Sequence, residues 1–404
     1  MPPQSVVFSA SAIADIYRDS DRRNLNSIGN EFRCLHGVAV PFAGSIAHRH
    51  FIPLSRLAFL QVRILQTSRT ISDAMWRGRP LANTMTSLNR RSFLETLSTL
   101  AAGSIVAGAA PSSLFGAVPQ GKPHINFPTA PRERIAVASY PFRMFIDAPG
   151  NRSRDAKQKG FPLTQFPAEV VEKFGVHGIE PLAQHFESTE PAYLEKFRGA
   201  VEKAKVRIVN IPTHVRESFY DTDATVRQKA VDVSKKWIDV AVAVGSPGVR
   251  PHINGSKTSK PDVDRAAESL RRLADYAAEK NVVVTLENDD PETEDAFFVV
   301  KVIDAVNHPY LRTLPDFANS VLKGDLDFNY RAMKEMFARA YNISHVKDGE
   351  ADDNGKILNI DIKKTFEIAK AANYRGFYSM EYDAPGDPYA PTKKLIELTL
   401  QNIS

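Results

Sequence analysis

The sequence contains a single cysteine, Cys34, so disulfides cannot hold the rest of the chain together. A domain that follows this cysteine must be stabilised by its hydrophobic core alone. Lysine is absent before Lys122 and frequent after it, and this change in composition marks a boundary between a leader and a folded region. With 404 residues, 43% of them hydrophobic, the chain is long enough for one large domain and a leader.

The folded region also lacks an excess of positive charge. The formal net charge of the whole chain is +5, but arginine outnumbers acidic residues in residues 1–84. From Lys122 onward the chain is close to neutral. Proteins that bind nucleic acid use a basic face to attract phosphates, so we expect no nucleic-acid partner.

No apolar run is long enough to cross a membrane as a stable helix. The best candidate, residues 97–110, has about fourteen residues where about twenty are needed. It is rich in Ala, Gly and Ser, and the segment from Arg90 to Leu94 (Arg-Arg-Ser-Phe-Leu) comes just before it. This order is similar to a twin-arginine export signal, with a small-residue cleavage site at residues 107–109.

The resemblance predicts three regions. Residues 1–84 are an unstructured or mis-assigned upstream extension, since an export signal should begin the chain and Met85 can serve as the initiator. Residues 85–117 are the export signal, which implies the Tat translocase as a partner and a periplasmic or exported location. Residues 122–404 form the folded domain. The alternative for the signal is an ordinary Ala-rich helix with a chance Arg-Arg pair.

After Arg134, short β-rich runs alternate with longer amphipathic runs, which predicts a (β/α)8 barrel. In the expected helix 262–279, apolar residues recur at three-to-four spacing and indicate one buried face. The expected strands are 134–142, 178–181, 206–214, 248–252, 281–286, two that begin at Leu311 and Ile343, and 376–381. Helices are expected to end at Gly175 and Gly245, to begin at Pro291, and to close the chain over 392–402. A doubly wound sheet would need a glycine-rich phosphate turn after an early strand, and none is present.

Four polar residues lie at the ends of the last four expected strands: Glu287, Asp316, His345 and Glu381. They are about thirty residues apart, the length of one strand and one helix with their loops, so they should meet at the mouth of the barrel. Three carboxylates and one imidazole suit a divalent cation. Each residue alone could equally be a helix cap, a salt-bridge partner or a structural histidine.

On these four residues, and on the segment His345-Val346-Lys347-Asp348, the region from Arg134 to Ser404 resembles the xylose isomerase-like TIM barrel superfamily. The resemblance implies one ion of Mn²⁺, Mg²⁺, Co²⁺ or Zn²⁺ held by the four residues. It also implies that Glu287 and Glu381 are catalytic, while Asp316 and His345 are ligands only.

The chemistry implied is proton transfer on a hydroxy-ketone through an enediolate, which a divalent ion stabilises and two carboxylates complete. Members that epimerise ketoses commonly have a His three residues after the strand-six Asp, whereas this chain has Asn319. That departure weakens the case for one particular epimerase activity. The candidates for binding a sugar substrate are His214, Arg250, His252, Asn319, Lys347 and Glu180.

An exported enzyme would not meet sugar phosphates, and the loop 382–387 after strand eight is acidic where a phosphate needs N–H groups or cations. We therefore expect an unphosphorylated sugar or keto-sugar. A lyase or dehydratase, or a keto-glycoside-cleaving enzyme, is the first alternative, and a non-catalytic carbohydrate-binding barrel is the second. A homo-oligomer is compatible with the sequence, which does not decide the oligomeric state.

Overall fold

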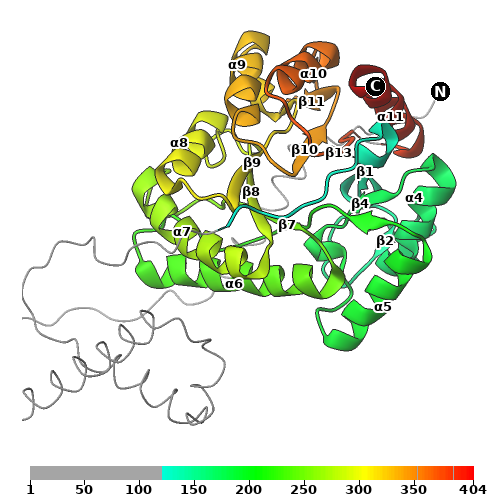
Figure 1. Cartoon of the computed structure of the whole chain (residues 1–404), viewed down its shortest axis with the longest axis horizontal. Coiled ribbons are helices and arrows are strands. Elements are labelled where there is room, and N and C mark those ends of the chain that lie inside the picture. The colour runs from blue at the N-terminus through cyan, green and yellow to red at the C-terminus, as the bar shows by residue number, and fades with distance from the viewer. Residues whose placement is uncertain (1–120, 353, 385) are drawn as a thin grey trace, which may run out of the picture. The chain divides into compact units, whose positions relative to one another are not determined.

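The computed structural model describes residues 121–352, 354–384 and 386–404. The expected extension 1–84 and export signal 85–117 lie outside these residues. The described part is a parallel barrel of eight staves with helices around it, as expected from the sequence (Figure 1). No helix among the described residues is long and apolar enough to span a bilayer.

The staves follow one another around the barrel in chain order. A five-stranded sheet runs β10-β13-β1-β4-β5 and a four-stranded sheet runs β6-β7-β8-β9, with parallel pairing throughout. Parallel bridges from Thr313 to Ala340 and from Asp316 to His345 join β9 to β10 and close the barrel. The strands are β1 Ile135–Ala138, β4 Gly178–Glu180, β5 Arg207–Ile208, β6 Pro212–Thr213, β7 Gly248–Pro251, β8 Val283–Glu287, β9 Leu311–Leu314, β10 Ile343–Val346 and β13 Phe377–Met380.

The expected third strand, 206–214, is two short strands. Val209 N–H donates to Ile179 O on one side, whereas Ile211 N–H donates to Gly248 O on the other. The stave therefore changes partner between these residues, and Pro212, which has no N–H, begins the second piece.

Eight helices cover the outside of the barrel in the described residues (Figure 1). In α7 the expected apolar face is confirmed, because Ala266, Leu270 and Leu273 are fully buried. Left-handed Gly175 and Gly245 end α4 and α6 as expected. The helices are α4 Phe166–Phe174, α5 Pro191–Lys203, α6 Ala224–Val244, α7 Val263–Lys280, α8 Ala296–Val306, α9 Leu326–Phe337, α10 Ile362–Ala371 and α11 Tyr389–Ile403.

The expected start of α8 at Pro291 is wrong by five residues. Asp290 Oδ1 accepts hydrogen bonds from the N–H groups of Glu292 and Thr293 and holds this segment in a turn. Asp295 then caps the helix by accepting from the N–H groups of Phe297 and Phe298. The acidic run contains turn and cap residues and not the first turn of the helix.

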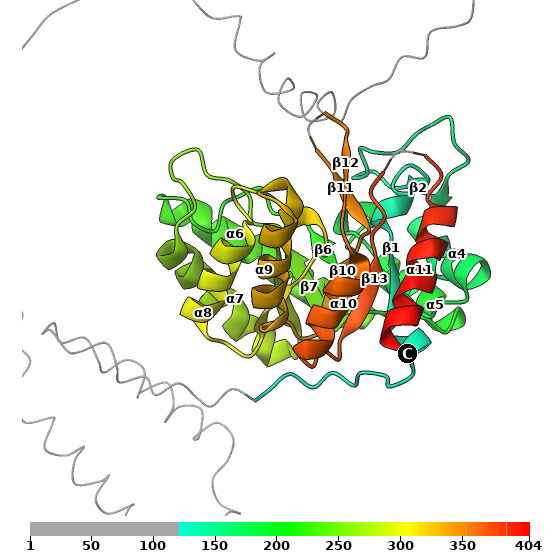
Figure 2. The same ribbon diagram turned by 90° about the horizontal axis from the view of Figure 1, so that it is seen from above.

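The two ends of the barrel differ (Figure 2). At the mouth, where the strands end, a hairpin of β11 (Gly349–Ala351) and β12 (Ile357–Asn359) projects from the end of β10. At the opposite end, the segment 121–130 crosses the floor. Its Ile125 and Phe127 pack on a small apolar cluster that includes Phe377, and Tyr341 Oη donates to Pro123 O at 2.8 Å. Neither the hairpin nor the floor segment was expected from the sequence.

Candidate functional site

The four residues expected to share a metal lie together at the mouth. Glu287 ends β8, Asp316 follows β9, His345 lies within β10 and Glu381 follows β13. One ligand atom from each lies within 4.8 Å of the others, and all four residues are buried. Parallel staves place their carboxyl ends at one edge, so residues about thirty positions apart in sequence become neighbours.

His345 joins the members of this cluster. Its Nδ1 lies 2.8 Å from Glu287 Oε1 and 3.1 Å from Glu381 Oε2. Its Nε2 lies 3.1 Å and 3.0 Å from the two carboxylate oxygens of Glu180. The two ring nitrogens therefore face different groups, and only Nδ1 faces the other proposed ligands.

Asp316 has one satisfied oxygen and one that is not. Oδ1 accepts hydrogen bonds from the N–H groups of Ala318 and Asn319 at 2.9 and 2.8 Å. Oδ2 is buried and has no hydrogen-bond donor, and the nearest cation, Lys347 Nζ, is 3.7 Å away. Burial raises the pKa of Asp316 to about 7, although Lys347 opposes the shift and Glu287 and Glu381 add to it.

The donor set fits a divalent cation. A buried carboxylate oxygen without a donor is costly in a folded protein, and a cation at the centre of the cluster would satisfy it. Three carboxylates and a neutral imidazole nitrogen are ligands that Mn²⁺, Mg²⁺ and Zn²⁺ all accept, so the set does not select one metal.

A second group of possible ligands, His252, Asp289 and Glu294, also lies within 4.8 Å. Here Arg250 already supplies the positive charge, because its Nη2 is 2.8 Å from Asp289 Oδ2 and 3.0 Å from Glu294 Oε2. Burial lowers the pKa of His252, but Glu294 and Asp289 outweigh it and raise that pKa to about 10. We interpret this group as an ion-pair network in which His252 is charged.

Arg250 connects this network to the metal cluster. Its Nε lies 2.8 Å from Glu287 Oε2, while the other oxygen of Glu287 faces His345. Three carboxylates therefore surround one guanidinium, and because Nε makes no hydrogen bond, Arg250 acts on Glu287 through its charge. The sequence suggested that Arg250 contacts substrate, and the structure engages its Nη2 with Asp289 and Glu294.

A cavity of about 220 Å³ opens above the cluster. Of the residues proposed to bind substrate, His214, Arg250, His252 and Lys347 line it, whereas Glu180 and Asn319 do not. Asn319 is buried and accepts a hydrogen bond from Lys347 Nζ at 2.9 Å, so it orients this lysine. Glu180 is fully buried beneath His345.

Lys347 lies between the cavity and the cluster. Its ammonium group is 3.6 Å from Glu381 Oε2 and 3.7 Å from Asp316 Oδ2, and Glu350 Oε2 accepts its hydrogen bond at 3.0 Å. Burial lowers the pKa of this lysine, but Asp316, Glu350 and Glu381 raise it well above the usual value. Lys347 is therefore a fixed cation in the cavity wall.

The cavity also has polar lining residues that the sequence did not suggest. Tyr140 Oη donates to Asp383 Oδ2 at 3.0 Å, and Arg143 pairs with Oδ1 of the same aspartate at 2.8 Å. Burial raises the pKa of Tyr140, and Asp383 adds to this effect. Asp289 and Asp383 each follow a proposed ligand by two residues, so the strand-end pattern could have identified them. Gln184 lines the cavity from a loop and gives no such signal.

Comparisons with known proteins agree with the fold. The sequence profile described as xylose isomerase-like TIM barrel matches residues 168–401. No curated protein matches the chain in sequence.

Solved structures match in fold at low sequence identity. A D-allulose 3-epimerase from Methylomonas sp. has 16% identity and a TM-score of 0.51, covering 69% of this chain and 100% of its own. A xylose isomerase-like TIM barrel protein from Mycobacterium smegmatis in complex with magnesium has 18% identity and a TM-score of 0.52, covering 67% and 96%. An L-ribulose 3-epimerase has 16% identity and a TM-score of 0.53, covering 67% and 95%.

Proposed function

This chain belongs to the xylose isomerase-like TIM barrel family, and from that premise we propose that it is a divalent-metal-dependent sugar isomerase or epimerase. The observation that supports the proposal most strongly is the cluster of Glu287, Asp316, His345 and Glu381 below a polar cavity. The sugar epimerases among the structural neighbours are consistent with it, although their likeness extends to the fold alone.

The four residues would hold one ion, and Asp316 Oδ2 is the ligand atom for which the structure offers no hydrogen-bond donor. When bound, such an ion polarises the carbonyl and hydroxyl oxygens of a hydroxy-ketone and makes the C–H between them more acidic. Asp316 and His345 then act only as ligands, because Asp316 Oδ1 is committed to backbone N–H groups and His345 Nε2 to Glu180.

Proton transfer is assigned to Glu287 and Glu381. Both carboxylates line the cavity, and they come from different staves, β8 and the end of β13. In epimerisation one carboxylate removes the proton from one face of the carbon and the other returns a proton to the opposite face. The positive charge of Arg250 lies beside Glu287, and Lys347 lies near Glu381 where it can stabilise negative charge on a substrate oxygen.

The cavity favours a sugar without phosphate. Asp289 and Asp383 line it, and its cations Arg250, His252 and Lys347 are each paired with carboxylates. A phosphate would need unpaired cations or free backbone N–H groups. We also propose that the protein is exported by the twin-arginine route, because the pair Arg90-Arg91 precedes the small-residue run 97–110. An exported enzyme would meet free sugars or keto-sugars and not sugar phosphates.

One observation favours elimination as the second candidate activity. His252 lines the cavity and is held in its charged form, so it can donate a proton to a departing hydroxyl or glycosidic oxygen. The same carboxylate that enolises the substrate would then serve a lyase or a keto-glycoside-cleaving enzyme.

The test is a screen of free sugars and keto-glycosides in D₂O with Mn²⁺ supplied, followed by NMR and mass spectrometry. Deuterium incorporation beside the carbonyl with an epimeric product is the expected result. Loss of water or of an aglycone would identify the lyase. If wild type and Glu381→Gln bind a sugar equally and neither exchanges any C–H, the domain is a binding barrel and the enzyme proposal is wrong.

A further inference from the structure

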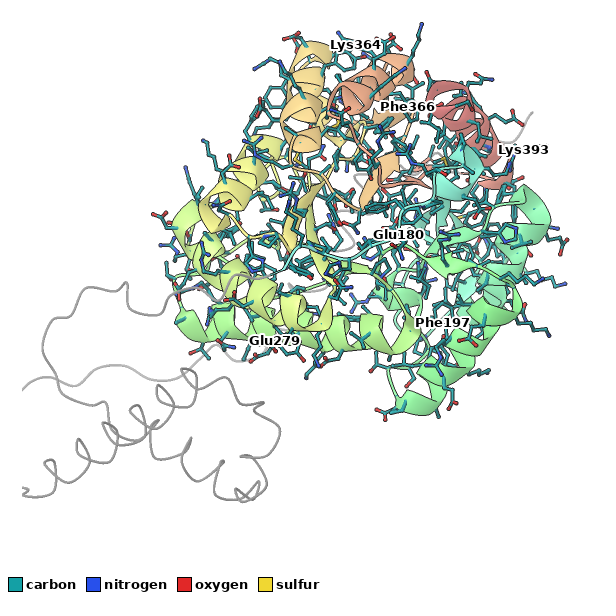
Figure 3. The ribbon with its side chains drawn as sticks, in the orientation of Figure 1. Glu180, Phe197, Glu279, Lys364, Phe366 and Lys393 are labelled. Carbon is teal, nitrogen blue, oxygen red and sulfur yellow. The ribbon has the colours of Figure 1, made fainter. Side chains whose placement is uncertain are left out.

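Glu180, the last residue of β4, lies inside the barrel directly beneath His345. Figure 3 labels it among the strands, well inside the ring of helices that carries Glu279 and Lys393. Glu180 has no exposed surface and His345 is 1% exposed. Both Glu180 oxygens lie within 3.1 Å of His345 Nε2, so the contact is close and buried.

This contact determines which nitrogen of His345 can bind a metal. A carboxylate only accepts hydrogen bonds, so Nε2 must carry a proton toward Glu180. Nδ1 also faces carboxylates, but these belong to Glu287 and Glu381, which are proposed ligands of the ion, whereas Glu180 is not. An ion bound by them would take the lone pair of Nδ1, and Nε2 would keep the proton that Glu180 accepts.

Glu180 is itself fixed from two directions. Its backbone pairs with Ala138 of β1, and its carbonyl accepts a hydrogen bond from Ser139 N–H at 2.9 Å. Its Oε1 accepts from Asn210 Nδ2 at 2.9 Å, and Asn210 is also fully buried. The backbone contacts fix where the side chain begins, and the carboxylate cannot turn away from His345 without losing the hydrogen bond from Asn210.

We propose that Glu180 is a positioning residue for the metal site, where it selects the Nδ1 tautomer of His345 and strengthens the imidazole as a ligand. This inference rests on the proposed function only in requiring that the four residues bind a metal. It replaces the sugar-binding role that the sequence suggested for Glu180. A carboxylate behind a metal-bound histidine changes metal affinity by about 10- to 100-fold in known sites.

Glu180→Gln is the most direct variant. If the amide oxygen keeps the hydrogen bond from Asn210, the NH₂ group replaces Oε2, the oxygen 3.0 Å from Nε2, so the ring N–H loses one of its two acceptors and the negative charge. We expect the dissociation constant for Mn²⁺ or Co²⁺, measured by calorimetry with chelator competition, to rise about 10- to 100-fold.

Asp221→Asn is the matched control. Asp221 is a buried carboxylate that accepts hydrogen bonds from Ser256 and Thr258, and it lines neither the cavity nor the cluster. The change of atoms is the same, so a purely structural effect of losing a buried charge should appear in both variants. We expect Asp221→Asn to bind metal as wild type does, within twofold.

A spectroscopic measurement on wild type tests the proposal even if the Glu180→Gln variant does not fold. In the Co²⁺-loaded protein, NMR should show one hyperfine-shifted exchangeable imidazole N–H that exchanges slowly with solvent, because Glu180 covers it. The same proton should exchange faster in Glu180→Gln. An absent or rapidly exchanging signal in wild type would overturn the assignment, as would equal metal affinities of wild type and Glu180→Gln.

These outcomes separate the two proposals. Metal binding that depends on Glu180, without exchange of any substrate C–H, would contradict the proposed activity and support the positioning role. Substrate C–H exchange in D₂O, together with a Glu180→Gln variant that binds metal as tightly as wild type, would support the proposed activity and contradict the positioning role of Glu180.

Discussion

Asp316 Oδ2 is buried without a hydrogen-bond donor, so we predict that the ionised carboxylate lowers the stability of the metal-free protein at neutral pH. Replacing Asp316 with Asn should remove this loss of stability. In the variant, the amide oxygen can keep the hydrogen bonds from Ala318 and Asn319. The amide nitrogen would replace Oδ2, which has no donor, and could donate to the neighbouring carboxylates. The variant should therefore be more stable without metal and unable to bind metal tightly.

The size of the effect follows from the pKa of Asp316, which burial raises from 3.8 to about 7. Below pH 3.8 both folded and unfolded chains hold the proton, and the residue does not affect stability. As the pH rises toward 7 the unfolded chain ionises first, so the stability of the folded state falls. A shift of about three units corresponds to about 4 kcal/mol, of which about 3 kcal/mol lies between pH 5 and pH 8.

The assay is urea unfolding in the presence of a chelator at pH 5 and pH 8, with wild type and Asp316→Asn compared at each pH. The free energy of unfolding of wild type should fall relative to the variant by about 3 kcal/mol from pH 5 to pH 8. Saturating Mn²⁺ should restore wild type but not the variant. Parallel pH profiles of the two proteins would refute the reasoning, because Asp316 would then already be compensated.

Three further predictions concern other parts of the site and fold. Glu381→Gln should slow C–H exchange by about 10²- to 10⁴-fold in a D₂O assay, and an unchanged rate would remove Glu381 from catalysis. The raised pKa of His252 stabilises the fold below pH 6.5 and this contribution is lost toward pH 10, so wild type should lose about 3 kcal/mol relative to His252→Gln between pH 6.5 and 9 in urea unfolding. An equal loss of unfolding free energy in the two proteins would show that Glu294 does not keep His252 protonated. Phe127→Ala should destabilise the barrel by about 2 kcal/mol in urea without changing metal affinity, and a stability equal to wild type would show that residues 121–130 do not support the floor.

The barrel could be predicted from the sequence because its signals are local and repeated. Strand-length apolar runs alternate with amphipathic helices, and left-handed Gly175 and Gly245 end two helices where expected. The ligand cluster was predictable for the same reason, since strand ends in a parallel barrel meet at one place. The four residues then needed no long-range information beyond the fold.

Contacts between distant segments could not be predicted in this way. Glu180 reads as a rim residue in sequence, yet β4 places it beneath His345, 165 positions later. The turn before α8 was missed because Glu294 serves Arg250 and His252 and not a helix terminus. Pairings of this kind depend on which staves are neighbours and which way each side chain points.

A crystal structure of the folded domain grown with Mn²⁺, with the ion located by its anomalous scattering, tests the metal site most directly. One ion should be bonded to carboxylate oxygens of Glu287, Asp316 and Glu381 and to Nδ1 of His345, at about 2.0–2.2 Å. A cluster without an ion at saturating Mn²⁺, or an ion bonded through Nε2 of His345, would contradict the proposed site.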